Sequence, residues 1–191
     1  MSSVLNLNSE FAPPLPIRKF TVLQYHQLGE LGVLTQDDRV ELLEGWIVKK
    51  MNQGPAHGFL VQFLSIWLNS RLPQGWICRC QLPITTLSSE PEPDLAVVVG
   101  SISDFRERHP SGTDCRLIIE VSDSSLQKDR AKGAIYFSAG VKEYWIVNLA
   151  DQHVECYQEG ALDSPQIFSR NDTIGLKLGD STIELALSDL L

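Results

Sequence analysis

The sequence lacks the marks of a membrane protein and of a disulfide-stabilised secreted protein. No apolar run approaches the roughly 18 residues that a membrane-spanning helix requires. The N-terminal stretch has no basic region followed by an apolar core, which a secretory signal would have. The four cysteines include no CxxC pair, which disfavours both a zinc site and a disulfide framework. We therefore expect a cytoplasmic protein that has no contact with a membrane.

Basic residues are also scarce. The chain has 16 lysines and arginines against 24 acids, which gives a net charge of −8. A protein that coats nucleic acid nonspecifically needs a basic surface to displace counterions from the phosphates, so this class is disfavoured. An enzyme that meets nucleic acid through a local basic rim and bound metal ions is still compatible with the composition. No Ser-His-Asp or Cys-His arrangement is evident, which discourages a hydrolase with a nucleophilic side chain.

The composition is that of a folded domain preceded by a short arm. Hydrophobic residues make up 43% and charged residues 21% of 191 residues, as in a globular protein of one domain. Three prolines near the N-terminus favour an extended chain, so residues 1–19 are predicted to form a flexible arm. No internal repeat and no linker interrupts residues 20–191, which we predict to be a single domain.

Hydrophobic periodicity predicts a mixed α/β fold. Apolar residues recur at i, i+3 and i+4 in the helical candidates, and buried runs between turn residues indicate strands. A Thr21–Gln24 capping box opens the first helix. Helices are predicted at about 21–31, 56–72 and 126–139, a hairpin at 39–51, strands at 75–85, 94–99, 116–121 and 143–149, and further short β segments within 152–185.

Two acids mark the ends of neighbouring strand candidates. Asp94 begins the apolar run 95–99, and Glu120 ends the run 117–119. If these strands pair antiparallel, the two side chains lie opposite each other, with β-carbons about 5 Å apart. Two such carboxylates repel each other unless a cation lies between them, and carboxylate oxygens are the ligands that Mg²⁺ and Mn²⁺ prefer. The pattern therefore suggests a divalent metal site formed by Asp94 and Glu120.

Phosphodiester hydrolysis also needs a basic side chain that orients water or stabilises the developing charge. Period-two geometry would place it two residues after Glu120, but Ser122 occupies that position. The following helix offers Lys128, Arg130 and Lys132 instead. Lys132 lies near the edge of that helix's apolar face, so it is the preferred candidate.

The order of these elements and motifs resembles the core of the PD-(D/E)XK nuclease superfamily, with PD at 93–94 and an acid ending the third strand. More narrowly, the sequence resembles a bacterial family described as putative restriction endonucleases, formerly a domain of unknown function and abundant in photosynthetic bacteria. The resemblance covers about residues 20 to 160. It is carried by VELLEG at 40–45, His57, EPD at 92–94, and the run from IIEVSDS through GVKEYWIVN.

The resemblance implies a restriction-endonuclease-like core of helix, three strands, helix and strand, in which helices flank a mixed central sheet and β hairpins are added at both ends. It also implies a nuclease site in which Asp94 and Glu120 bind Mg²⁺ or Mn²⁺ and Lys132 replaces the lysine usually found at the position of Ser122. Glu41 or Glu44 would supply a further acid, and His57 and Ser122 are additional candidate site residues.

Several of these residues also have plainer interpretations. Glu41 and Glu44 suit the surface of a hairpin, although Glu41 has apolar neighbours and could point inward. Ser122, Ser124 and Ser125 suit a turn and a helix cap, and Asp129 suits the first turn of a helix. The aromatic residues Tyr136, Phe137, Tyr144 and Trp145 are most simply core.

Two hypotheses follow. The first is a metal-dependent endonuclease that hydrolyses DNA. The alternative is a catalytically silent nuclease-fold protein that binds or assembles, with a homodimer through exposed β hairpins as one expected form. Binding of a divalent ion and cleavage of DNA distinguish the two hypotheses.

Overall fold

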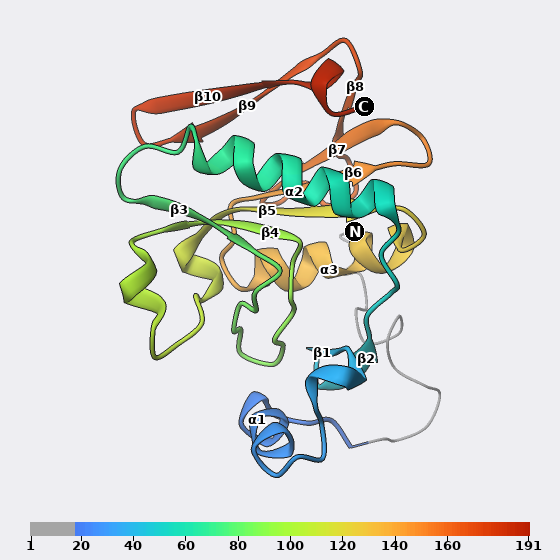
Figure 1. Ribbon diagram of the computed structural model, residues 1–191, viewed down its shortest axis with the longest axis vertical. Coiled ribbons are helices and arrows are strands. Elements are labelled where there is room, and N and C mark those ends of the chain that lie inside the picture. The colour runs from blue at the N-terminus through green and yellow to red at the C-terminus, as the bar shows by residue number, and fades with distance from the viewer. Residues whose placement is uncertain (1–17) are drawn as a thin grey trace.

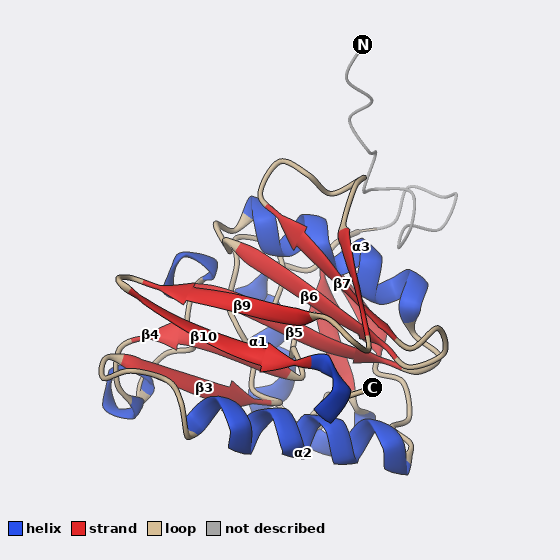
Figure 2. Ribbon diagram, turned by 90° about the horizontal axis from the view of Figure 1, so that it is seen from above, coloured by secondary structure: helices blue, strands red, loops and turns tan. Residues whose placement is uncertain are grey.

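A six-stranded mixed sheet forms the centre of the molecule. The structure is a computed structural model that describes residues 18–191, so most of the predicted arm at 1–19 lies outside the described residues. The spatial order of the strands is β3-β4-β5-β6-β7-β8. Helices α2 and α3 lie on opposite faces of this sheet (Figures 1 and 2). This is the mixed α/β architecture that the sequence predicts.

One pair of strands in the sheet is parallel, and the remaining pairs are antiparallel. Strands β5 and β6 run parallel, so the chain has to cross over between them, and α3 forms this crossover. The sheet consists of β3 (Trp76–Cys80), β4 (Leu95–Val99), β5 (Cys115–Ser122), β6 (Glu143–Asn148), β7 (His153–Gln158) and β8 (Gln166–Ser169).

The two faces of the sheet are covered differently. Helix α2 (Pro55–Asn69) and the hairpin of β9 (Thr173–Leu178) and β10 (Ser181–Ala186) pack on one face, where they meet Ile119 of β5. Helix α3 (Leu126–Ser138) packs on the other face, where it meets Ile118. Because successive strand residues alternate between faces, Glu120 points toward α3, on the same side as Ile118.

The N-terminal lobe comprises α1 (Val22–Glu30) and the hairpin of β1 (Val40–Leu43) and β2 (Trp46–Lys49), and it lies at one end of the molecule (Figure 1). The predicted Thr21–Gln24 capping box is present. Glu44 and Gly45 both have positive φ, which a two-residue hairpin turn of the primed type requires. Short 3₁₀ turns occur at Gln36–Asp38, Ile102–Phe105, Gly112–Asp114 and Leu187–Asp189.

The predicted helices and hairpins are confirmed, apart from shifts of a few residues at their ends. The largest difference is at 75–85, where the strand ends at Cys80. Gln81 adopts the left-handed conformation with φ of 50°, which an extended strand does not tolerate. Across the described part of the chain, no helix combines the length and hydropathy needed to span a bilayer.

Candidate active site

Asp94 and Glu120 lie opposite each other at adjacent strand ends. Strands β4 and β5 pair antiparallel with Leu95 opposite Ile119, and the next step in this register brings Asp94 beside Glu120. The Asp94 amide donates to Oε2 of Glu120 at 3.3 Å, and the Val121 amide donates to Oδ2 of Asp94 at 2.9 Å. The predicted juxtaposition of the two acids is therefore present. Both side chains are buried.

Helix α3 presents a stripe of polar side chains to this strand end. Lys128, Lys132 and Tyr136 are spaced by four residues, so they lie on one face of the helix. Lys132 Nζ lies 2.6 Å from Oε1 of Glu120, and the Tyr136 hydroxyl donates to the same oxygen at 2.6 Å. The predicted placement of Lys132 beside Glu120 is confirmed, whereas Tyr136 is more than a core aromatic residue.

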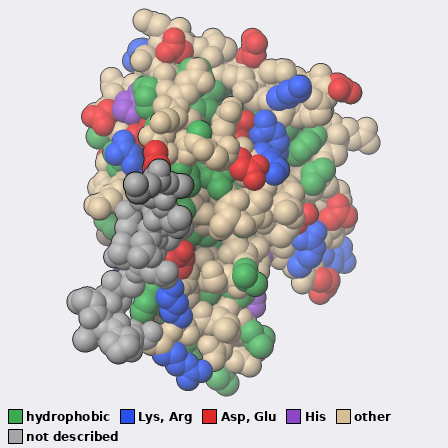
Figure 3. All heavy atoms as spheres, turned by 180° about the vertical axis from the view of Figure 1, so that it is seen from behind, with side chains coloured by type: hydrophobic (Ala, Val, Ile, Leu, Met, Phe, Trp, Pro, Cys, Tyr) green, Lys and Arg blue, Asp and Glu red, His purple; other side chains and the backbone are tan. Residues whose placement is uncertain are grey.

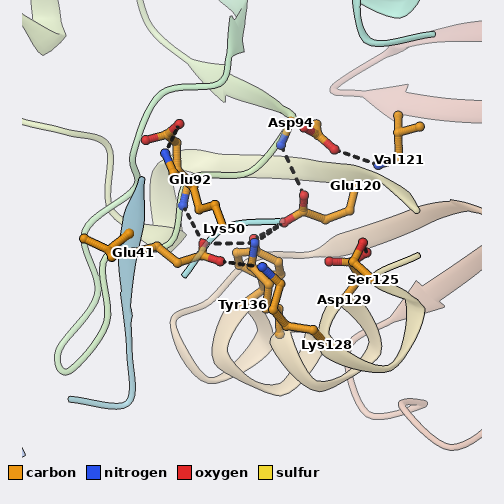
Figure 4. Close-up of polar contacts among 12 residues, drawn as sticks. Glu41, Lys50, Glu92, Asp94, Glu120, Val121, Ser125, Lys128, Asp129 and Tyr136 are labelled. Atoms are coloured by element: carbon orange, nitrogen blue, oxygen red, sulfur yellow. Dashed lines mark hydrogen bonds and ion pairs between the residues drawn. The ribbon is translucent and has the colours of Figure 1, made fainter. Parts of the chain in front are cut away.

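Glu41 joins the cluster from the N-terminal lobe (Figure 4). Its Oε2 lies 3.2 Å from Lys132 Nζ, and its Oε1 lies 3.1 Å from Lys128 Nζ. Only 2% of Glu41 is exposed. The interpretation of Glu41 as a surface residue of the hairpin is therefore wrong, because its apolar neighbours Leu42 and Leu43 draw the strand into the core and the two lysines compensate its charge.

The protonation states follow from burial and from these ion pairs. Burial raises the pKa of Glu120 to about 8, although Lys132 acts in the opposite direction. Burial alone would lower the pKa of Lys132, but Glu120 and Glu41 outweigh this effect and raise it well above its ordinary value. Burial would likewise raise the pKa of Glu41, yet Lys132 and Lys128 lower it. Lys132 is thus a permanent cation, and Glu41 is ionised.

His57 approaches the cluster from the first turn of α2. Its Nε2 lies 3.0 Å from Oδ2 of Asp94, and its Nδ1 is buried without a hydrogen-bond partner among residues 18–191. Burial lowers the pKa of His57, but the hydrogen bond and charge of Asp94 outweigh this and raise it. Gly54 caps α2 and Pro55 begins it, which fixes where His57 enters. His57 therefore orients Asp94.

The remaining candidates have other positions. Ser122 is buried beside Asp129 and forms no hydrogen bond with Asp94 or Glu120. Glu44 lies in the hairpin turn and does not join the cluster, in contrast to Glu41. Arg130 was one of the basic candidates, but it binds Glu155 of β7 instead. A residue two positions from Lys132 points to the opposite side of the helix, which explains this outcome.

Two features of the site were not assigned to it from the sequence. Asp129 lines the pocket and accepts a hydrogen bond from Ser125, and burial raises its pKa. Lys50 and Glu92 form an ion pair of 2.7 Å at the mouth. For the polar face of α3, the only sequence signal was the four-residue spacing of Lys128, Lys132 and Tyr136. Lys50 and Glu92 could not be assigned from the sequence, because they come together only in the tertiary structure.

These side chains line a small pocket with a volume of about 60 Å³, enough for a few water-sized groups. Six carboxylates line it against three lysines and one histidine, so its walls carry an excess of negative charge. The charged residues of the lining are Glu41, Glu92, Asp94, Glu120, Asp123, Asp129, Lys50, Lys128, Lys132 and His57.

This set of donors fits Mg²⁺ or Mn²⁺ better than Zn²⁺. Among residues 18–191, no three His, Cys, Asp or Glu side chains converge into a ready-made metal cage. Mg²⁺ is usually held by one or two carboxylates and completes its shell with water and substrate phosphates. Asp94 Oδ1 accepts no hydrogen bond from any described residue, and Glu120 Oε2 accepts only the long bond from the Asp94 amide. Two hard oxygen donors are therefore available beside surplus negative charge.

Comparison with known proteins places the chain in a family. A crystal structure of a putative nuclease from Anabaena variabilis ATCC 29413, of the domain family of unknown function DUF820, superimposes with a TM-score of 0.67. The two chains are 18% identical over 84% of this chain and 94% of that one, a similarity that supports the fold. No curated protein matches the sequence. The profile of the Uma2 family, described as putative restriction endonuclease, matches residues 22–188. Because this match covers most of the chain, the protein belongs to the Uma2 family of putative restriction endonucleases.

Proposed function

We propose that this protein is a divalent-metal-dependent endonuclease that hydrolyses phosphodiester bonds in DNA. The observation that carries the proposal is the adjacent pair of carboxyl groups, Asp94 and Glu120, with the Lys132 ammonium 2.6 Å from Glu120. Glu120 accepts a hydrogen bond from the Asp94 amide, and Asp94 accepts one from the Val121 amide. Membership of the putative restriction endonuclease family supports nuclease activity. The excess of carboxyl groups over lysines in the pocket supports binding of a cation.

In this proposal Asp94 and Glu120 hold Mg²⁺ or Mn²⁺. When bound, such an ion polarises the phosphate and lowers the pKa of a coordinated water. Lys132 is held in its charged form by Glu120 and Glu41, so it serves as an electrostatic partner for charge that develops on the phosphate, and it is unsuited to act as a general base. His57 fixes the orientation of Asp94 through the 3.0 Å contact with Oδ2.

The acidity of the chain limits how DNA can approach. Figure 3 shows one face on which, outside the grey atoms, basic and acidic side chains are interspersed without an extended patch of either sign. A substrate of high negative charge would therefore be held by local basic groups and by the metal ion rather than by the overall field of the protein. Lys50 and Lys128 line the pocket and are suitable local groups.

A cleavage assay tests the proposal. Supercoiled and linear DNA are incubated with the protein and Mg²⁺ or Mn²⁺, and we expect cleavage that chelation abolishes. Asp94→Asn and Glu120→Gln should each remove activity while the circular dichroism spectrum is retained. Glu143→Gln is the matched control, because Glu143 is also a buried strand acid but is paired with Arg116 outside the pocket. Cleavage that survives both site substitutions would refute the proposal.

One observation favours the alternative, a nuclease-fold protein that binds nucleic acid without cutting it. Both oxygens of Glu120 already accept hydrogen bonds within the protein, from Lys132, Tyr136 and the Asp94 amide. An ion would have to compete with these contacts. The alternative predicts that calorimetry detects no uptake of Mg²⁺ or Mn²⁺ by the wild-type protein and that DNA remains intact.

A further inference from the structure

A series of neighbouring hollows begins at the catalytic pocket. The pocket shares Lys50 and Glu92 with a larger cleft beside the N-terminal lobe. This cleft shares His26 and His109 with the next hollow. That hollow in turn shares Phe105 and Arg106 with a last one, which is lined by β3 and by the segment 100–106 that follows β4. Each hollow therefore shares lining residues with the next, and we call this series of four hollows the groove.

The charge of the groove changes along its length. Carboxylates outnumber lysines around the catalytic pocket. In the third hollow, Arg106, Arg108 and two histidines face the single acid Glu107. The last hollow is lined by Arg79, Arg106 and otherwise uncharged residues, and no carboxylate of the described chain lines it. In a protein with a net charge of −8, one end of this groove is therefore suited to a cation and the other end to anions.

The basic end is built around Phe105. The guanidinium carbons of Arg79 and Arg108 lie 5.5 Å and 5.0 Å from the centre of its ring. Arg108 is neutralised by Asp114 at 2.7 Å, but Arg79 forms no ion pair with any described residue. The Nε of Arg79 is buried and has no hydrogen-bond partner among residues 18–191.

The buried Nε of Arg79 is costly to leave unpaired, because burial removes water from it and no described residue supplies a hydrogen-bond acceptor or an anion in its place. This burial lowers the pKa of Arg79. Exposed Arg106 extends from the same hollow and, among described residues, has no ion pair either. Arginine presents a fork of donors that matches the oxygens of a phosphate. Phosphate groups in this hollow would supply the anions that both side chains lack.

We infer that the end of the groove formed by Arg79, Arg106 and Phe105 binds phosphate groups of the nucleic-acid strand whose scissile bond lies in the catalytic pocket. This inference rests on the proposed function, since it extends the same substrate from the metal end of the groove to its basic end. The groove thereby sets which stretch of the strand the protein contacts beyond the cleaved bond, and it contributes affinity where the acidic pocket cannot.

Binding of duplex DNA in the presence of a chelator tests the inference without cleavage. Fluorescence anisotropy is measured over a range of salt concentrations for a long duplex and for a short duplex that covers only the catalytic pocket. Each lost phosphate contact should lower the slope of log affinity against log salt by about one. We expect this change for Arg79→Met and for Arg106→Gln with the long duplex, and little change with the short one.

Arg170→Gln is the matched control, because Arg170 is exposed and lines none of these hollows. If Arg79→Met proves unstable, Arg106→Gln still decides the question, since its side chain is exposed. Slopes equal to that of Arg170→Gln in both variants would overturn the inference, as would failure of the wild-type protein to bind the long duplex.

Two further results separate the alternatives. Calorimetry with inorganic phosphate that detects an Arg79-dependent site, together with unchanged duplex binding in Arg79→Met, would assign the site to a small phosphorylated molecule and overturn the inference. Cleavage is scored separately with Mg²⁺. A protein that cuts no DNA but binds it through Arg79 and Arg106 refutes the proposed function alone, whereas normal cleavage with unchanged slopes refutes the inference alone.

Discussion

The ammonium nitrogen of Lys132 lies 2.6 Å from Oε1 of Glu120, and both residues are buried. The same nitrogen is 3.2 Å from Glu41, so one cation of α3 joins the end of β5 to the first strand of the N-terminal lobe. Glu120 and Glu41 thus share one cationic partner, and a second lysine, Lys128, binds Glu41. One buried lysine therefore connects α3 to both β5 and β1, and in the proposed function the same lysine also supports the chemistry.

Replacing Lys132 by Met should cost stability as well as activity. The substitution leaves Glu120 and Glu41 buried without their common partner, and breaking a buried ion pair in this way costs about 3–5 kcal/mol. Urea unfolding provides the measurement. Lys142→Met is the control, because the Lys142–Glu159 pair is more than half exposed and its removal should cost about 1 kcal/mol or less. Equal losses for the two variants would show that Lys132 is not the compensating charge.

Tyr136 and Tyr144 offer a matched pair of hydroxyl deletions. Both are fully buried, but the Tyr136 hydroxyl donates to Glu120, whereas the Tyr144 hydroxyl donates to the backbone carbonyl of Asp129. Each Tyr→Phe change should lower the free energy of unfolding by about 1–2 kcal/mol, the cost of an unsatisfied acceptor. Only Tyr136→Phe should also lower the cleavage rate. Equal rates in both variants would separate the Tyr136 hydroxyl from the chemistry.

The local patterns of the sequence predicted the part of the site that depends on strand register and on helix faces. Asp94 begins one apolar run and Glu120 ends the next, and antiparallel pairing of the two strands sets these acids opposite each other. The burial of Glu120 against α3 follows from alternation after Ile118. Lys132 follows from its position on the helix that crosses over to β6.

Contacts between segments that are distant in the sequence could not be predicted from these patterns. Glu41 lies 87 residues before Lys128, and nothing in a hairpin sequence indicates that lysines of a distant helix will bind it. The apolar neighbours of Glu41 left an inward orientation open, but they gave no information about its partners. Arg130 is the opposite case, because its position on the helix suffices to place it on the side away from Lys132. There it binds Glu155 of β7.

The raised pKa of Glu120 predicts a pH dependence of metal binding. Burial holds this pKa at about 8, so below that pH the carboxyl group carries a proton that an incoming divalent ion must displace. Affinity for Mn²⁺ should therefore rise by up to about tenfold per pH unit as pH approaches 8, and level off above it. Calorimetry at neutral pH in buffers of different ionisation enthalpy should detect about one proton released per ion. A flat affinity without proton release would contradict this assignment.

Glu155 predicts a separate pH dependence, in acid and outside the pocket. Burial alone would raise its pKa, but hydrogen bonds from Arg130, Tyr157 and His153 outweigh this and lower it to about 2 from an ordinary 4.5. Between these values the unfolded chain binds the proton more readily than the folded one, so stability falls as pH falls from about 4.5 toward 2. The contribution is fully present above 4.5.

Glu155→Gln removes this titration, so the variant should lose less stability than the wild-type protein on acidification over that range. The difference should be on the order of 2 kcal/mol, since half-exposed Arg130 is partly screened by solvent. Urea unfolding at a series of pH values measures it. Glu159→Gln, which changes an exposed acid, should leave the pH profile parallel to that of the wild-type protein. A profile of Glu155→Gln that is also parallel would mean that the Arg130–Glu155 pair does not control stability in acid.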